Sequence, residues 1–506
     1  MARAQQPDTR WLAGELLSLL SLAEGGWQHI PLSDLTLDSR QVRPGSLFLA
    51  LKGSSGHGLG HLSQALEQGA ALVLAEVSDE WSAENIRSLE APVPVLPVEG
   101  LRERASDIAA RFFGDPAARM RMIGVTGTNG KTSVSLFLAQ ALPDKWHCAV
   151  TGTTGNGFPG ALRPATHTTP DAVEAQRILA RLREQGAGAV AMEVSSHALD
   201  QHRLAAVPFH TAVFTNLSRD HLDYHGSMRA YAAAKGRLFD IPGLELAVIN
   251  TDDETGVELL ERLKGRVRTV ACHRGGRTLG ADEFIRLENL EQRPRGLALQ
   301  LSSSWGQAEI ESRLVGDFNA ANLMLVLAVL LSWGVPMEEA VSRLEALETV
   351  PGRMQAFGGE DRPLVVVDYA HTPDALGKAL SSLRAHCRGR LFCVFGCGGD
   401  RDRGKRPQMG ALAEAMADRV VVTDDNPRHE ASPAIIADIL EGMEQPGEVL
   451  VQPDRARAIA RAIAEAAPGD IVLVAGKGHE TWQQVGDLRL PFSDLEQVCR
   501  CLEEKK

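Results

Sequence analysis

The stretch Met122-Ile-Gly-Val-Thr-Gly-Thr-Asn-Gly-Lys-Thr-Ser133 decides the fold. Its first four residues are apolar and are bounded by turn residues, which is typical of a buried strand. Two glycines then form a loop without side chains, and the apolar-rich residues 133–142 that follow are typical of a helix. Backbone N–H groups in such a loop point inward and bind phosphate oxygens, helped by the positive end of the helix. The stretch therefore predicts a phosphate-binding loop in an α/β protein.

The side chains that end this loop fit a nucleoside triphosphate. Lys131 can reach the terminal phosphates, and the hydroxyl of Thr132 can ligate magnesium. The alternative is an ordinary glycine turn before a helix, which Gly-Lys-Thr between a strand and a helix disfavours. The loop departs from the strict P-loop pattern, because Val125 stands where that pattern has glycine, five positions before Gly130.

The composition is that of an ordinary globular protein. The 506 residues suffice for two to four domains, with 44% hydrophobic and 23% charged residues. A net charge of -12 without a basic block argues against a nucleic-acid surface. We find no apolar run of membrane-spanning length and no secretion signal. The seven cysteines lack zinc-site spacing, which favours reduced thiols in a cytoplasmic protein.

Three domains are predicted. Residues 1–99 form a small α/β domain whose boundary is marked by a proline-rich run ending at Pro97. Residues 100–350 alternate strands and helices, which indicates a doubly wound parallel sheet of the P-loop type. Residues 351–506 form a second, Rossmann-like α/β unit. We predict buried strands at 46–51, 71–75, 122–125, 148–151, 189–193, 212–215, 246–250, 364–368, 391–395, 419–423 and 471–475, and helices at 62–69, 133–142, 171–185, 227–239, 319–333 and 337–347.

Polar residues follow the central strands at the edge where ligands collect in such sheets. Glu193 is placed to ligate magnesium, and His221 or Asp220 can join it. The alternative for His221 is a capped loop histidine, but its position after a strand favours the ligand. Lys235 lies on a predicted helix among small and apolar residues, and its spacing alone favours a surface lysine.

The third domain repeats this arrangement. Polar, glycine-rich loops follow its strands at Asp368–Pro373, Gly396–Pro407, Asp424–Arg428 and Gly476–Glu480, and they form one rim. Arginines there can bind carboxylates through paired hydrogen bonds. These residues predict a magnesium-dependent nucleotide enzyme with an anionic or zwitterionic second substrate, and they leave open whether it is a kinase or a ligase.

The order of the motifs resembles the Mur ligase family. The motifs are Gly127-Thr-Asn-Gly-Lys-Thr132, Glu193-Val-Ser-Ser-His197, Thr215-Asn-Leu-Ser-Arg-Asp-His221, Gly316-Asp-Phe-Asn-Ala-Ala-Asn322, Pro351-Gly-Arg-Met354 and Asp368-Tyr-Ala-His-Thr-Pro373. The resemblance implies an ATP- and Mg²⁺-dependent ligase of peptidoglycan biosynthesis, which serves cell-wall biogenesis, cell shape and cell division. It also implies a cytoplasmic enzyme, which we expect to be a monomer.

Two further motifs resemble one branch of the family. Asp425-Asn-Pro-Arg428 and Gly476-Lys-Gly-His-Glu480 are similar to the branch that adds meso-diaminopimelate to the D-glutamate γ-carboxylate of UDP-N-acetylmuramoyl-L-alanyl-D-glutamate. In that reaction ATP converts the carboxylate into an acyl phosphate, which the amine then attacks. The same ligase adding L-lysine, a ligase like folylpolyglutamate synthetase, and a non-catalytic nucleotide-dependent scaffold are the alternatives.

The resemblance assigns residues to each substrate. ATP is expected at Gly127, Thr128, Asn129, Gly130, Lys131, Thr132, Ser133, Asn319 and Arg353. The UDP-muramoyl-dipeptide is expected at Leu37, Ser39, Ser54, Ser55, Gly56, Thr168, Thr169, Ser195, Gln201 and Arg203, and diaminopimelate at Arg401, Asp425, Asn426, Pro427, Arg428, Gly476 and Glu480. The resemblance makes Lys131, Glu193, His221 and Lys235 catalytic, with magnesium held by Thr132, Glu193, His221 and a carbamate on Lys235.

Overall fold

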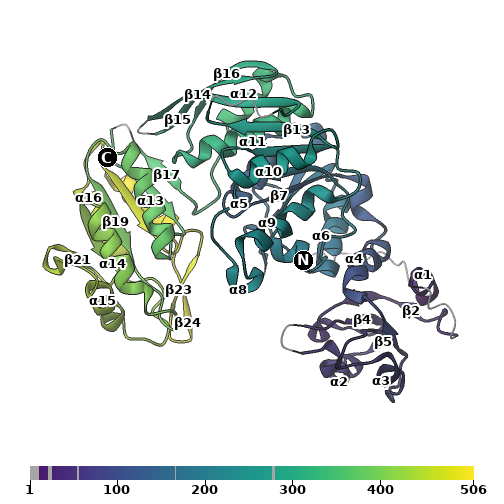
Figure 1. Cartoon of the computed structure of the whole chain (residues 1–506). Helices are drawn as coiled ribbons and strands as arrows, with labels where there is room; N and C mark the ends of the chain where they lie inside the picture. The colour runs from purple at the N-terminus through teal and green to yellow at the C-terminus, as the bar shows by residue number, and fades with distance from the viewer. Residues whose placement is uncertain are drawn as a thin grey trace. The chain divides into compact units, whose positions relative to one another are not determined.

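The computed structural model describes residues 11–20, 26–53, 56–165, 167–275, 280–293, 295–359 and 361–505. The chain forms two compact units, Met1–Val270 and Ala271–Lys506. This division falls inside the predicted central domain, residues 100–350. Each unit is an α/β structure with its own buried core (Figure 1).

The first unit begins with a small parallel sheet. Its strands lie in the order β3-β4-β5-β6, and they include both strands predicted in this region. Pro97 lies within β6, so the end of the proline-rich run is part of the sheet. The strands are β3 (Asp34–Thr36), β4 (Ser46–Ala50), β5 (Ala70–Glu76) and β6 (Val95–Val98), the helices are α1 (Ala13–Leu19), α2 (Leu62–Glu67) and α3 (Ala83–Arg87), and β1 (Trp11–Leu12) pairs with β2 (Pro31–Leu32).

Helix α4 (Leu101–Phe112) closes the core of this sheet. Leu101, Ala105 and Ile108 of the helix pack with Leu47 and Leu74 of the strands. The helix is amphipathic, and burial of its apolar face stabilises its contact with the sheet.

A larger sheet of the first unit carries the phosphate loop. Its strands lie in the order β12-β11-β7-β10-β8-β9, and all neighbours are parallel except β8 and β9. The strands are β7 (Arg121–Thr126), β8 (Cys148–Gly152), β9 (Gly155–Gly157), β10 (Ala189–Glu193), β11 (Phe209–Phe214) and β12 (Leu246–Asn250), and the helices are α5 (Lys131–Ala141), α6 (Ala172–Glu184), α7 (Ser196–Asp200), α8 (Leu222–His225), α9 (Met228–Gly236) and α10 (Glu254–Leu263). The predicted doubly wound arrangement is confirmed, with β7 between β10 and β11.

The second unit contains an antiparallel meander that our prediction missed. It consists of β14 (Glu283–Arg293), β15 (Gly296–Ser303) and β16 (Gly306–Ser312). Side chains of β16 alternate between exposed and buried, whereas our prediction relied on continuous apolar runs. Helices α11 (Phe318–Ser332) and α12 (Met337–Glu345) follow as predicted, and β13 (Arg268–His273) spans the division between the units.

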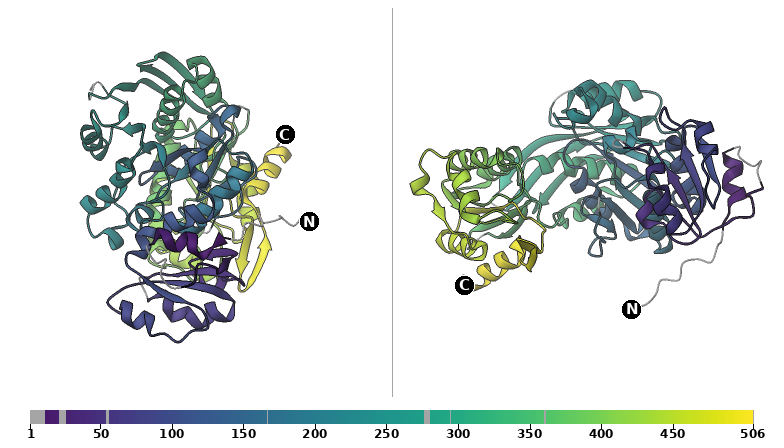
Figure 2. Two further views of the ribbon diagram at one scale, coloured as in Figure 1. Left: turned by 90° about the vertical axis from the view of Figure 1, so that its right-hand side faces the viewer. Right: turned by 90° about the horizontal axis from the view of Figure 1, so that it is seen from below.

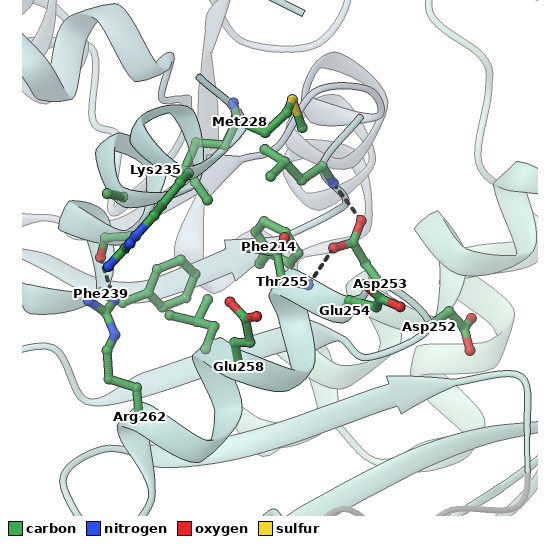
Figure 3. Close-up of a pocket in the computed structure, with 16 residues that line it drawn as sticks. Phe214, Met228, Lys235, Phe239, Asp252, Asp253, Glu254, Thr255, Glu258 and Arg262 are labelled. Atoms are coloured by element: carbon green, nitrogen blue, oxygen red, sulfur yellow. Dashed lines mark hydrogen bonds between the residues drawn. The ribbon is translucent and has the colours of Figure 1, made fainter. Parts of the chain in front are cut away.

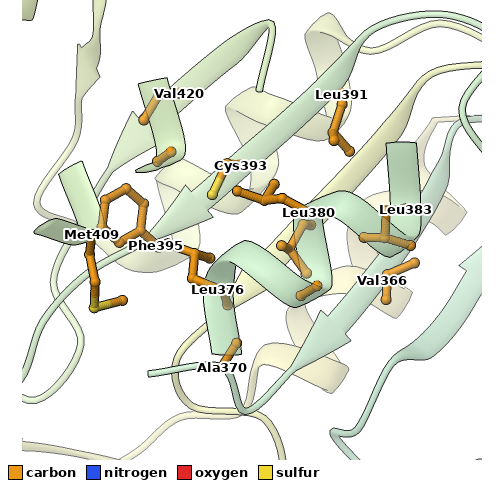
Figure 4. Close-up of a cluster of buried hydrophobic side chains, with 14 of the residues drawn as sticks. Val366, Ala370, Leu376, Leu380, Leu383, Leu391, Cys393, Phe395, Met409 and Val420 are labelled. Atoms are coloured by element: carbon orange, nitrogen blue, oxygen red, sulfur yellow. The ribbon is translucent and has the colours of Figure 1, made fainter. Parts of the chain in front are cut away.

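The remaining sheet has the order β17-β18-β22-β19-β20-β21, and its four predicted strands are parallel. Alternate strand residues face two cores. Val366 and Phe395 pack against α13–α15 (Figure 4), whereas Val367 and Val394 pack against α16 and α17. Figure 2 shows the ribbon of this sheet and its helices from two further directions. The elements are β17 (Gln355–Gly358), β18 (Leu364–Asp368), β19 (Leu391–Phe395), β20 (Arg419–Val422), β21 (Leu450–Val451), β22 (Ile471–Ala475), α13 (Pro373–His386), α14 (Lys405–Met416), α15 (Ser432–Leu440), α16 (Arg455–Glu465) and α17 (Asp494–Glu504). A separate hairpin of β23 (Trp482–Val485) and β24 (Leu488–Pro491) lies between β22 and α17 in the sequence.

All seven cysteines are free thiols, which agrees with the expected reduced state. Within the described ranges, no helix has the length and apolar character needed to cross a membrane.

Candidate active site

The predicted phosphate loop connects β7 to the first turn of α5, which begins at Lys131 and includes Thr132 and Ser133. Gly127 has φ 152°, and a Cβ there would lie 1.9 Å from the hydroxyl of Thr215. Gly130 caps the helix in the left-handed region, at φ 84°. The first N–H groups of a helix have no intrahelical acceptor, so those of α5 are available to a phosphate.

Asn216 holds this loop in place, a role that our prediction missed. Its backbone carbonyl accepts a 2.8 Å hydrogen bond from the N–H of Thr128. Its side chain accepts from the N–H of Asn129 at 3.0 Å and donates to the carbonyl of Asn129 at 3.1 Å. Asn216 lies two residues after the end of β11, and a polar residue near a strand's carboxyl end was the signal that could have identified it.

Lys131 lies over the loop it follows. Its Nζ donates to the carbonyls of Gly127 and Thr128, at 2.9 Å each. Burial lowers the pKa of Lys131, while the negative charges of Glu193 and Asp220 oppose that shift. The amine is thus placed beside the loop that would hold the terminal phosphates.

Glu193 lies at the centre of the candidate site and is only 1% exposed. Its Oε2 accepts a 2.8 Å hydrogen bond from the hydroxyl of Thr132, and its Oε1 accepts one of 2.7 Å from the N–H of Thr153. Burial raises the pKa of Glu193, and the charge of Lys131 opposes this. Carboxylate and hydroxyl oxygens are the hard donors that Mg²⁺ prefers, so the Thr132–Glu193 pair fits that ion.

Lys235 and His221 both contact Tyr231, a residue to which our prediction gave no role. The Nζ of Lys235 donates a 2.7 Å hydrogen bond to the carbonyl of Gly127 and lies 4.5 Å from the ring centroid of Tyr231. The ring of His221 is 5.9 Å from the same tyrosine ring. Lys235 is 2% exposed, so our spacing-based reading of a surface lysine was wrong. Its side chain instead points into the predicted ATP site.

His221 contacts His197 and Asp220 at the start of α8. It is a non-glycine residue with φ 51° at the start of α8, and its ring packs edge-on against His197 at 4.8 Å. Its Nε2 lies 3.5 Å from the carboxylate of Asp220. The described residues contain no group of three or more His, Cys, Asp or Glu side chains arranged to hold a metal ion. The predicted ligand set therefore depends on Thr132, Glu193 and Lys235 as well as His221.

The residues expected to bind the muramoyl-dipeptide meet beside Glu193. The hydroxyl of Thr169 donates to the Glu193 carbonyl at 2.8 Å and accepts from the N–H of Ser195 at 3.0 Å. Arg203 donates to the Thr169 carbonyl at 3.0 Å and to the Gln201 amide oxygen at 2.7 Å.

Thr153, another residue that our prediction missed, connects Glu193 to the residues expected to bind the muramoyl-dipeptide. Its hydroxyl donates to that of Thr168 at 3.2 Å, while its N–H holds Glu193.

The residues expected at the uridine end lie in the small sheet and its loops. Leu37 lines a cavity of about 320 Å³ together with Asp38, Asn156 and His167. Ser39 is 6% exposed and donates to Gln64 at 2.7 Å. Ser54 and Ser55 lie outside the described residues, and Gly56 follows them in a bend.

A second cavity, of about 790 Å³, lies between α9 and α10 (Figure 3). Lys235 contributes to its wall, but no residue of the phosphate loop does. Asp253 on the opposite wall accepts from the N–H groups of Leu217 and Thr255 at 2.6 and 2.9 Å. The phosphate loop does not line this cavity, and we assign no substrate to it.

The residues expected to bind diaminopimelate cluster in the second unit. Asn426 donates to Glu480 at 2.9 Å, and the N–H of Gly399 donates to the Asn426 carbonyl at 2.9 Å. Arg428 has φ 51° and donates to the Gly399 carbonyl at 2.7 Å, while Arg401 lies exposed on the same loop.

Close packing fixes the backbone of this cluster. A Cβ on Gly476 would lie 2.6 Å from a carboxylate oxygen of Asp425, and one on Gly399 would lie 1.9 Å from the carbonyl of Pro427. Burial raises the pKa of Asp425, and the positive charges of Arg455 and Lys477 oppose this.

The two residues expected at the ATP base and sugar also belong to the second unit. Asn319 lies in the first turn of α11, where its amide donates to the carbonyl of Val315 at 2.8 Å. The guanidinium of Arg353 lies 5.1 Å from the ring centroid of Tyr369. Their contacts with nucleotide stay predictions.

Sequence models of Mur ligase domains match three parts of the chain. The Mur ligase family catalytic domain matches residues 32–113, the Mur ligase middle domain 125–330, and the Mur ligase glutamate ligase domain 352–478. The fold and the phosphate loop agree with these matches. The chain belongs to the Mur ligase family.

Its relatives include proteins named UDP-N-acetylmuramoyl-L-alanyl-D-glutamate--2,6-diaminopimelate ligase. The one from Alkalilimnicola ehrlichii is 53% identical, covering 94% of this chain and 96% of its own. The one from Pseudomonas aeruginosa is 50% identical, covering 96% and 98%. A solved structure of a ligase with that name is 36% identical with a TM-score of 0.73, covering 98% of this chain and 99% of its own.

Proposed function

We propose that the chain is an ATP-dependent ligase that joins meso-diaminopimelate to the D-glutamate γ-carboxylate of UDP-N-acetylmuramoyl-L-alanyl-D-glutamate. The observation that carries this proposal is the position of Glu193. Its carboxylate contacts Thr132 on the phosphate loop, and Thr153 links it to Thr168 among the acceptor residues. A phosphate on the loop and an acceptor on the other side would therefore meet at Glu193.

The proposed reaction has two chemical steps. First, a γ-carboxylate oxygen attacks the γ-phosphorus of ATP, and the bond to ADP breaks to leave an acyl phosphate. The amine of diaminopimelate then attacks the acyl carbon. The resulting tetrahedral intermediate expels inorganic phosphate and loses a proton to form the amide. A carboxylate oxygen is a poor leaving group, so phosphorylation makes the second step feasible.

The chain's contribution is positioning and neutralisation of charge. The N–H groups at the start of α5 and the amine of Lys131 bind the phosphates, and Arg203 orients the acceptor. Magnesium, held by Thr132, Glu193 and His221, would neutralise further negative charge when bound.

Lys235 is proposed to act as a carbamate. Burial is the larger cause and repulsion from Lys131 the smaller one, and together they lower the pKa of Lys235 to about 6. Its amine is therefore largely neutral at pH 7. A neutral amine can attack carbon dioxide, forming an N–C bond and releasing a proton. The product is an anion with two oxygens, which suits a second magnesium ion where an ammonium would repel it.

The cluster around Asn426 supports a zwitterionic amino acid as the second substrate. Arg428 can bind a carboxylate, and Glu480 can bind an ammonium group. Lysine would offer the ammonium without the carboxylate, which favours diaminopimelate. We further propose three domains, 1–99, 100–350 and 351–506, in a cytoplasmic monomer that serves cell-wall growth and division. The spacing of the three matched segments supports the domain division.

An isotope experiment tests this function. The acceptor is prepared with ¹⁸O in its D-glutamate γ-carboxylate and incubated with ATP, Mg²⁺ and diaminopimelate. An acyl phosphate transfers one labelled oxygen to each inorganic phosphate released. Unlabelled phosphate accompanying amide formation would contradict the proposed route.

A further inference from the structure

Lys477 has no role among the sequence predictions above, yet this lysine is fully buried. Its side chain has 0% exposure, and it follows Gly476 at the carboxyl end of β22. Its Nζ donates to Oε2 of Glu480 at 2.9 Å and to Oδ1 of Asn426 at 3.1 Å. It also lies 5.5 Å from the ring centroid of Trp482. A buried ammonium is costly unless it is paired, so these contacts account for its position.

These contacts fix the orientation of the Asn426 amide. Its Oδ1 accepts from the amine of Lys477 and, at 2.9 Å, from the N–H of Gln484. Its Nδ2 donates to Oε2 of Glu480 at 2.9 Å. A flipped amide would turn its NH₂ group toward two donors and its oxygen toward a carboxylate. The observed orientation is therefore strongly preferred.

The same contacts leave one oxygen of Glu480 available. Oε2 accepts from both Lys477 and Asn426. Oε1 accepts no hydrogen bond from the residues that the structure describes, and the side chain is 19% exposed. A carboxylate oxygen with no hydrogen-bond partner among the described residues is suited to a substrate ammonium group.

We propose that Lys477 is a positioning residue that sets the specificity for the amino-acid substrate. It holds Asn426 and Glu480 so that Oε1 of Glu480 receives the ammonium at the end of diaminopimelate that does not react. This inference rests on the proposed function, and it adds the residue that makes the pocket select a distal ammonium.

The test compares diaminopimelate with 2-aminopimelate, which keeps the reacting amine and the distal carboxylate but lacks the distal ammonium. The wild-type chain should prefer diaminopimelate in kcat/KM. In Lys477→Met, which removes the charge but keeps a long apolar side chain, that preference should fall about tenfold or more. The KM for ATP should stay unchanged.

Two controls separate positioning from a structural role. Lys378→Met removes an exposed lysine that pairs with Asp374 at 2.7 Å in the same unit, and it should leave the preference unchanged. Glu480→Ala should remove the preference for diaminopimelate, and Glu480→Ala combined with Lys477→Met should change that preference no further, because Lys477 acts on the ammonium through Glu480.

Each outcome supports or overturns the inference. An unchanged preference in Lys477→Met, or additive effects in the double variant, would overturn it. If Lys477→Met does not fold, Lys477→Gln replaces it, and failure of both to fold would assign Lys477 a purely structural role and also overturn it. A wild-type chain that forms no amide with diaminopimelate would overturn the proposed function itself.

Discussion

The amine of Lys235 donates a 2.7 Å hydrogen bond to the carbonyl of Gly127, the first glycine of the phosphate loop. The amine of Lys131 donates to the same oxygen at 2.9 Å. Two lysines from distant parts of the sequence thus meet at one acceptor. Burial and this proximity lower the pKa of Lys235 from 10.5 to about 6.

This shift makes stability depend on pH. The unfolded chain protonates Lys235 below about pH 10.5, whereas the folded chain does so only below about 6. The unfolded state therefore binds more protons between these values, and the folded state becomes more stable as pH rises. The free energy of unfolding of the wild type relative to Lys235→Met should increase from pH 6 to 9 in carbon dioxide-free buffer, by at most about 1.4 kcal/mol per pH unit. Urea unfolding measures this, and a difference independent of pH would contradict the burial of this amine.

Activity gives a second test of Lys235. Lys235→Ala should strongly reduce the rate of ligation. A short carboxylate or bicarbonate should restore part of that rate by supplying the oxygens of the missing carbamate. Lys264→Ala, at an exposed position after α10, should keep full activity with no response to these additives. Full activity in Lys235→Ala would exclude a role in the reaction.

Lys131 should be required for turnover but not for folding. Lys131→Ala removes the amine beside the phosphates and should lower phosphate release by about 10³-fold. Circular dichroism should show an intact fold. Release at the wild-type rate from a folded Lys131→Ala variant would rule out this loop as the ATP site.

The sequence predicted the parallel strands and the phosphate loop because both produce strong local patterns. Gly127 lies where the loop passes close to the backbone of Asn216, and Gly130 adopts the left-handed φ that caps α5. The strand Ala189–Glu193 consists of a continuous apolar run up to its last residue. The contacts of Lys235 could not be predicted from spacing, because the partner carbonyl of Gly127 is 108 positions away. Asn216 and Lys477 were overlooked for the same reason, since each acts through residues distant in the sequence.

Replacing Arg428 should raise the KM for the amino acid far more than the KM for ATP. Arg428→Ala removes a charged donor beside the loop at Gly399, and the KM for diaminopimelate should rise about 30-fold. The KM for ATP should change little. Arg457→Ala, an exposed arginine paired with Asp454, provides the matched control. Equal increases in both KM values for Arg428→Ala would refute the pocket assignment.

The Thr132–Glu193 pair predicts a metal requirement. Thr132→Val removes the hydroxyl that lies 2.8 Å from the Glu193 carboxylate while keeping the shape of the side chain. The Mg²⁺ concentration for half-maximal activity should rise about tenfold, as when a residue supporting a metal site is lost. Titration of activity with Mg²⁺ measures this, and an unchanged midpoint would remove Thr132 from the metal site.

The most direct measurement is ADP release by the purified chain with ATP, Mg²⁺ and UDP-N-acetylmuramoyl-L-alanyl-D-glutamate, with diaminopimelate, lysine or ornithine as the added amine. We expect one ADP for each amide formed, and a much higher rate of ADP release with diaminopimelate than with lysine or ornithine. Lysine as the preferred amine would contradict the assignment of the substrate, and no acceptor-dependent ADP release with any amine would contradict the proposed ligase.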